Sequence, residues 1–112
     1  MSETRGKYNA RPETIDGIRF ASQAEARRYH ELRLLVMAGE IGELVCHPAW
    51  ILYPADKKRG LKAIRYTADI QYSENGRQVV EDVKGVTTRD AALRMNIFQR
   101  QHPEIDFRIV RT

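Results

Sequence analysis

Hydrophobic and polar positions alternate most regularly in the stretch LKAIRYTADIQY, residues 61–72. Such a period of two residues is typical of a β-strand with one buried face. The apolar face of this strand would carry Ile64, Tyr66, Ala68, Ile70 and Tyr72, and the polar face would carry Arg65, Thr67, Asp69 and Gln71. Asn75-Gly76 follows and is a strong signal for a tight turn, so QVVEDVKG should return as a second strand. The pattern therefore predicts a β-hairpin over residues 62–84.

A helical period marks residues 22–38, where Tyr29 and Leu32 belong to one apolar stripe. Ser22 is a suitable N-cap for this helix. Extending the stripe towards the N-terminus reaches Glu25. A carboxylate is therefore expected at the N-terminal end of the buried face.

A second helix is expected over residues 88–101, because Thr88 can cap it and Pro103 lies just beyond its end. A short hairpin at IDGIRF precedes the first helix, and IDFRIV forms a closing strand. This order of elements predicts one α/β (α+β) domain over residues 15–112, with a central mixed β-sheet flanked by helices. Residues 1–14 are polar and basic and are expected to form a flexible arm.

Composition narrows the class of protein. The chain has 112 residues, enough for one domain, and a single cysteine, Cys46, which excludes an internal disulfide and favours a reducing compartment. No membrane span is expected, because the chain has no apolar run of about 20 residues. No secretory signal is expected, because the N-terminal stretch MSETRGKYNARPET has no apolar segment. The net charge of +4 favours a polyanionic partner. We therefore expect a cytoplasmic protein with no membrane contact.

The register of the predicted hairpin brings acidic residues together. With Asn75-Gly76 at the centre of a type I′ turn, Asp69 lies directly opposite Asp82. Lys84 points to the same face as Asp82. Like charges opposed across a strand pair are destabilising, and a divalent metal ion would relieve the repulsion. The register thus predicts a metal site beside a lysine.

Such a site suits phosphodiester hydrolysis. Two carboxylates, Asp69 and Asp82, would hold Mg²⁺ or Mn²⁺, which activates a bound water and stabilises charge on the phosphate. Lys84 could orient the water or neutralise developing negative charge. Glu25 would be a further metal ligand or would hold a metal-bound water.

These residues resemble a known family. Asp69, a hairpin and then Asp82-Val83-Lys84 resemble the signature of the PD-(D/E)XK nucleases. Glu25 on a preceding helix is similar to the extra acidic residue of the Holliday-junction-resolvase branch. The resemblance implies a restriction-endonuclease-like fold, dependence on Mg²⁺ or Mn²⁺, and cleavage of DNA.

The wider sequence is similar to that of a group of short phage and prophage proteins of poorly defined function. The stretches concerned are KYNA, IDGIRFASQAEARRYHEL, AGEIGEL, YTADIQY and VVEDVKG. The similarity as a whole runs from about Lys7 to Phe107, nearly the whole chain. One departure from the nuclease motif is Ala68, where the nominal pattern has proline.

Each acidic residue also has an ordinary structural explanation. Glu25 follows Ser22 at the spacing of a capping box. Asp82 and Lys84 could form a surface ion pair, which contributes little. Glu81 falls on the opposite face of its strand from Asp82, and we do not expect it to be a ligand.

Exposed basic side chains could contact DNA phosphates without reading sequence, or could simply be solvated. The candidates are Arg27, Arg28, Lys57, Lys58, Arg59, Arg89 and Arg94.

The sequence therefore predicts a Mg²⁺-dependent DNA endonuclease, selective for branched or junction DNA, in phage recombination, replication or packaging. A phage-encoded protein would work in the cytoplasm of the bacterial host. A homodimer is plausible, because cutting two strands needs two sites and one chain carries one. The alternatives are a non-catalytic DNA-binding or scaffold protein of a phage DNA-processing machine, and a protein-interaction module.

Overall fold

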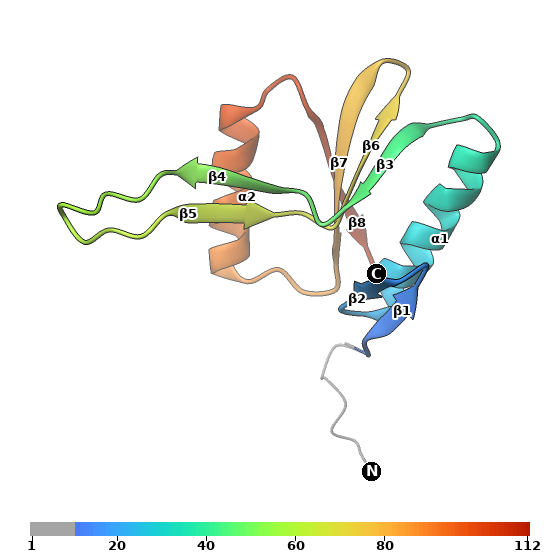
Figure 1. Ribbon diagram of the computed structural model, residues 1–112, viewed down its shortest axis with the longest axis horizontal. Helices are drawn as coiled ribbons and strands as arrows, with labels where there is room; N and C mark the ends of the chain where they lie inside the picture. The colour runs from blue at the N-terminus through green and yellow to red at the C-terminus, as the bar shows by residue number, and fades with distance from the viewer. Residues whose placement is uncertain (1–10) are drawn as a thin grey trace, which may run out of the picture.

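A mixed four-stranded sheet forms the centre of the protein in the computed structural model, which describes residues 11–112 (Figure 1). Its strands run in the order β3 (Gly42–Cys46), β6 (Ile70–Glu74), β7 (Arg77–Lys84) and β8 (Asp106–Arg111). The β7–β8 pair is parallel and the other two pairs are antiparallel. The predicted α+β class with a mixed sheet is confirmed.

Two helices cover opposite faces of this sheet (Figure 1). They are α1 (Gln23–Met37) and α2 (Arg89–Gln101), with Ser22 and Thr88 as their N-caps, as the sequence predicts. The apolar core is divided accordingly. One cluster lies on the α1 side and includes Phe20, Tyr29, Leu32, Ile70, Tyr72 and Val79, and the other lies on the α2 side and includes Leu52, Tyr66, Val80, Met95 and Phe98.

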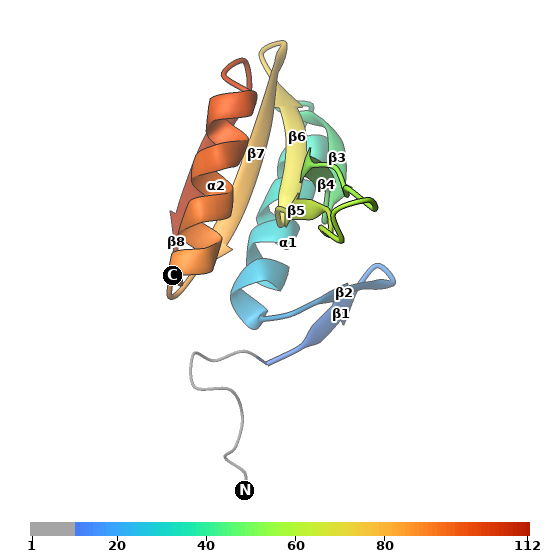
Figure 2. The same cartoon turned by 90° about the vertical axis from the view of Figure 1, so that its left-hand side faces the viewer.

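Two small hairpins complete the fold. The first, β1 (Glu13–Ile15) with β2 (Ile18–Phe20), lies next to the N-terminal end of α1 (Figure 2). The second joins β4 (Ala49–Tyr53) to β5 (Ile64–Thr67), and its connecting loop extends well beyond α2 (Figure 1). We call residues 49–67 the β4–β5 arm.

The predicted hairpin over residues 62–84 is wrong at its N-terminal half. The Asn75-Gly76 turn and the register from Glu74↔Arg77 to Ile70↔Glu81 are confirmed. The expected first strand is broken at Ala68, however, because β5 leaves the sheet and pairs with β4. Thr67 consequently pairs with Ala49 and does not lie opposite Lys84.

The break also divides the apolar face that alternation predicts. Tyr66 and Ala68 pack in the cluster under α2, whereas Ile70 and Tyr72 pack in the cluster under α1. Ile64 is exposed. Alternation thus indicates the burial of four of these five side chains, but not which neighbouring element covers them.

The predicted flexible arm over residues 1–14 is wrong at residues 13 and 14, which are part of β1. Glu13 and Thr14 already pair with β2, and residues 1–10 lie outside the described residues. Within the described part of the chain, no helix is both long and apolar enough to cross a membrane.

Candidate active site and metal site

Three carboxylates from separate elements meet at one end of the sheet. Glu25 comes from the first turn of α1, Asp69 from the link between β5 and β6, and Asp82 from β7. The charges of Glu25 and Asp82 both raise the pKa of Asp69, which indicates how near the three groups are. Lys84 completes the group, with its Nζ 3.1 Å from Oδ1 of Asp82. The four residues predicted from sequence therefore lie together.

Asp82 is the most enclosed of the three carboxylates, with 2% of its surface exposed. The hydroxyl of Tyr66 donates a hydrogen bond to its Oδ2, and Lys84 pairs with its Oδ1. Burial and the Asp82 carboxylate together raise the pKa of the Tyr66 hydroxyl, so Tyr66 stays a donor. Both oxygens of Asp82 are thus held in fixed directions.

Asp69 lies where the β6–β7 ladder ends. Its backbone N–H donates to the carbonyl of Glu81 at 3.2 Å, and its side-chain Oδ2 accepts from the N–H of Val83 at 2.6 Å. The predicted pairing of Asp69 with Asp82 is therefore not a ladder pair, because ladder pairing stops at Ile70↔Glu81. The carboxylate takes the place of a strand carbonyl and so remains beside Asp82.

The environment of Asp69 disfavours its charged form. Burial is the largest cause of its raised pKa, and the charge of Glu25 is the next. Together with Asp82 they raise the pKa of Asp69 to about 8, although the hydrogen bond from Val83 lowers it. A carboxyl that holds its proton near neutral pH is unusual and is typical of functional sites. The repulsion among these acids is what a bound cation would relieve.

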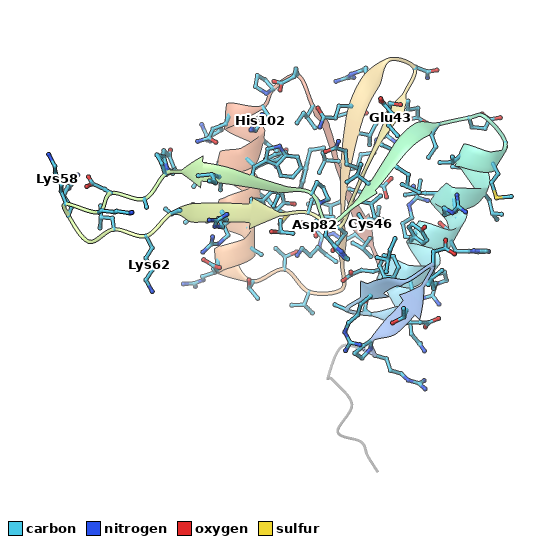
Figure 3. All side chains as sticks on the ribbon, in the orientation of Figure 1. Glu43, Cys46, Lys58, Lys62, Asp82 and His102 are labelled. Atoms are coloured by element: carbon cyan, nitrogen blue, oxygen red, sulfur yellow. The ribbon has the colours of Figure 1, made fainter. Side chains whose placement is uncertain are left out.

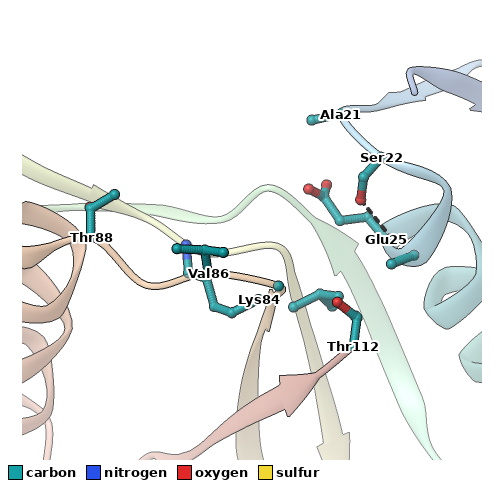
Figure 4. A pocket seen from close by; sticks show the side chains of 10 residues that line it. Ala21, Ser22, Glu25, Lys84, Val86, Thr88 and Thr112 are labelled. Atoms are coloured by element: carbon teal, nitrogen blue, oxygen red, sulfur yellow. Dashed lines mark hydrogen bonds between the residues drawn. The ribbon is translucent and has the colours of Figure 1, made fainter. Parts of the chain in front are cut away.

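Glu25 lies on the α1 side of the group with 13% of its side chain exposed. Burial raises its pKa, while a backbone hydrogen bond to Ala21 and the nearby His47 oppose the shift. Its backbone N–H donates to the Ser22 side chain at 3.2 Å, which is one half of the capping box (Figure 4). The capping explanation thus accounts for the N–H of Glu25, and its carboxylate lies close enough to Asp69 to affect the pKa of that residue.

A pocket of about 320 Å³ opens beside these acids, and Glu25 and Lys84 are its charged lining residues (Figure 4). The N-caps of both helices, Ser22 and Thr88, also line it. A substrate in this pocket would therefore lie next to the lysine and one carboxylate.

The donor atoms suit a hard cation. Within residues 11–112, no group of three or more His, Cys, Asp or Glu side chains is arranged to hold a metal ion. Mg²⁺, however, is usually held by one or two carboxylates and keeps several waters. Asp69 and Asp82 match that smaller donor set, and Glu25 would bind one of the waters.

Glu81, adjacent to the site in sequence, has a structural role. It is fully buried, and Arg28 donates from Nε to its Oε1 and from Nη2 to its Oε2, both at 2.8 Å. Tyr72 donates a further hydrogen bond to it. Burial would raise the pKa of Glu81, but these hydrogen bonds outweigh burial and hold it below the usual value. Arg28, predicted to contact DNA, is instead the half-buried partner of the fully buried Glu81.

The other basic residues predicted to contact phosphates differ in whether their side chains are already paired within the protein. Arg94 is engaged by Asp90 at 3.1 Å and by the carbonyl of Arg65 at 2.7 Å. Arg59 makes a long contact of 3.9 Å with Asp56. The remaining candidates are exposed and comprise Arg27, Lys57, Lys58 and Arg89.

Sequence reasoning missed two residues beside the site. Tyr66 was assigned to the face opposite Asp69, and only the break after β5 directs it to Asp82. His47 Nε2 lies 3.9 Å from Oε1 of Glu25, and its backbone has a φ of 56°. Alternation along a strand assumes extended backbone, so neither placement had a signal in the sequence.

The fold and site define a small α+β protein with a cluster of acidic residues and a lysine at one end of a mixed sheet. The family model described as "Protein of unknown function (DUF1064)" matches residues 5–112, and the chain belongs to this family. No curated protein and no solved structure matches the chain.

Proposed function

We propose that the protein is a metal-dependent DNA endonuclease of the PD-(D/E)XK type. The observation that carries the proposal is the convergence of Glu25, Asp69 and Asp82 from three elements, with Lys84 Nζ 3.1 Å from Asp82. Acids forced together at one end of a sheet reduce stability and therefore need a functional reason. Their order along the chain also matches the nuclease signature.

The chain's own residues would divide the work in hydrolysis. A divalent cation at Asp69 and Asp82 would supply an activated water and stabilise charge on the phosphate. The water oxygen would bond to phosphorus and give up one proton to solvent, the bond from phosphorus to one sugar oxygen would break, and that sugar oxygen would take up a proton from solvent. Lys84 would orient the water or neutralise charge on the phosphate, and Tyr66 would keep Asp82 in position.

Selectivity for branched DNA is the part of the proposal that rests on resemblance to the resolvase branch. Each chain supplies one acidic cluster, so cutting both strands would need two chains or two successive events. Phage recombination, replication or packaging would provide such substrates.

The decisive experiment compares DNA cleavage by wild type, Asp82→Asn and Lys84→Met. Branched and linear duplexes are incubated with each protein in Mg²⁺, in Mn²⁺ and in chelator. Cleavage should require metal and should fall at least about a hundredfold in both variants, because Asp82→Asn weakens the metal site and Lys84→Met removes the cation beside the reacting phosphate.

Matched controls for this experiment are Asp90→Asn and Arg100→Met, which remove one negative and one positive charge from exposed side chains of α2. Circular dichroism should show all four variants folded. Wild-type cleavage rates in folded Asp82→Asn would disprove the proposed mechanism.

A non-catalytic DNA-binding role is the second candidate. One observation favours it: both oxygens of Asp82 already have partners within the chain, Tyr66 and Lys84. This role predicts that the protein binds DNA but leaves it intact in Mg²⁺ and in Mn²⁺, so the same experiment separates the two.

A further inference from the structure

The β4–β5 arm is anchored to the protein along one face only. Trp50, Leu52 and Tyr66 face α2, where the ring centroids of Trp50 and Phe98 lie 4.5 Å apart. The connecting loop beyond these contacts extends past α2 and is closed by a bridge between Asp56 and Leu61 (Figure 1). A two-stranded ribbon is only marginally stable alone, so a protruding one suggests a function.

The arm holds most of the excess positive charge of the chain. Residues 54–63 contain four cations and a single acid, Asp56, whereas the whole chain has a net charge of only +4. The cations are Lys57, Lys58, Arg59 and Lys62. Within the described residues, only Arg59 of these four has an acidic partner. Lys58 and Lys62 point away from the body of the protein (Figure 3).

The outward face of the arm also exposes large side chains. Ile51, Tyr53 and Leu61 are each more than half exposed. This combination of free lysines and an exposed tyrosine on a narrow ribbon matches a polyanion better than an apolar protein partner.

The arm is continuous with the candidate active site. Asp69 follows the last residue of β5, Thr67, by two positions, and Tyr66 of β5 donates to Asp82. Arg59 lies eight positions before Thr67, and the chain between them passes from a turn at residues 57–60 into the strand at residues 64–67, so it spans at most about 25 Å. That distance equals about seven base pairs of duplex.

We propose that the β4–β5 arm binds duplex DNA through its backbone phosphates, within about seven base pairs of the bond that the acidic site would cut. A two-stranded ribbon fits the major groove, and lysines on it reach the flanking phosphates. The inference rests on the proposed DNA substrate but not on cleavage. DNA on the arm would fix where along the duplex the acidic site acts.

The test measures binding of a fluorescein-labelled 24-base-pair blunt duplex in chelator, by anisotropy across a series of KCl concentrations. Lys58→Gln/Lys62→Gln should weaken binding at least about tenfold at low salt and reduce the slope of log K against log salt by about 2. The matched control is Arg77→Gln/Arg100→Gln, which removes two exposed cations from the β6–β7 turn and the end of α2. It should leave both quantities near their wild-type values.

Three outcomes would overturn the inference. They are equal weakening in the two double variants, unchanged binding in the arm variant, and no binding of the duplex by the wild type. Binding is measured without divalent metal, so arm-dependent binding by a protein that never cuts DNA would reject the endonuclease and retain the arm.

A second measurement tests the arm as a contact between two copies of the chain. Ile51→Ser/Tyr53→Ser should leave the mass in solution unchanged, as measured by light scattering. Dissociation of a dimer by these substitutions, with unaltered DNA binding, would also overturn the inference.

Discussion

The carboxylates in the interior of this protein differ in how many cations and hydrogen-bond donors compensate their charge. Glu81 has a bidentate arginine, and Asp82 has a lysine and a tyrosine hydroxyl. Asp69 has one backbone N–H and two neighbouring acids, and its pKa rises to about 8. A buried carboxylate without a cation is costly, so Asp69 is where a metal ion would gain most.

The pH dependence of stability follows from this imbalance. Because the folded-state pKa of Asp69 is about 8 against an ordinary 3.8, its contribution to stability is present below about pH 4 and is lost as the pH rises towards 8. The raised pKa of Glu25 acts in the same direction. In chelator, the melting temperature should therefore fall from pH 5 to pH 8.5.

Asp69→Asn should flatten this profile, and at pH 8 it should melt a few degrees above wild type, because the amide oxygen can still accept from Val83. Mg²⁺ should raise the melting temperature of wild type more at pH 8 than at pH 5, since metal binding releases the proton of Asp69. In Asp69→Asn, the effect of Mg²⁺ should not increase with pH. Asp90→Asn serves as the exposed control. An Asp69→Asn protein that melts below wild type at pH 8 would contradict the account.

At the residue scale, the sequence identified the acids but not their partners. Asp69, Asp82 and Lys84 followed from one turn and a two-residue period, because both are local properties of the chain. The partner of Glu81 is Arg28, 53 positions away on another element. Choosing it among the 19 lysines and arginines needs the packing of α1 on the sheet, which no local pattern encodes.

At the element scale, helices with clear caps were predictable, and the strand that changes sheets was not. Ser22 and Thr88 begin their helices as expected, because capping depends on neighbouring residues alone. The stretch over residues 61–72 keeps its alternation even though it contributes to two sheets. Within α2, Leu93 is 60% exposed whereas Met95 is buried.

The Arg28–Glu81 pair joins α1 to β7, and breaking it should weaken that junction. Arg28→Met should lower the free energy of unfolding by about 3 kcal/mol, because it leaves the fully buried Glu81 without its cation. Arg28→Met/Glu81→Met should recover most of the loss. Urea unfolding measures both.

The control for this prediction is Arg33→Met on the same helix. Arg33 forms an exposed pair with Asp16 at 3.3 Å and should cost less than about 1 kcal/mol. Equal losses for Arg28→Met and Arg33→Met would mean that the buried pair does not hold α1 on the sheet.

At the scale of the whole molecule, one chain presents one acidic cluster at the end of one sheet, with a basic arm extending from it. Under the proposed endonuclease function, a single such molecule would cut one strand per encounter with DNA. A supercoiled plasmid with an inverted repeat that extrudes a branched junction should therefore pass through a nicked circle before becoming linear, when protein is limiting. Raising the protein concentration should increase the share of linear product, because two molecules then act on one junction. Gel electrophoresis of a time course distinguishes the forms. Linear product formed from the outset at the lowest concentration would show instead that two chains act as a preformed pair.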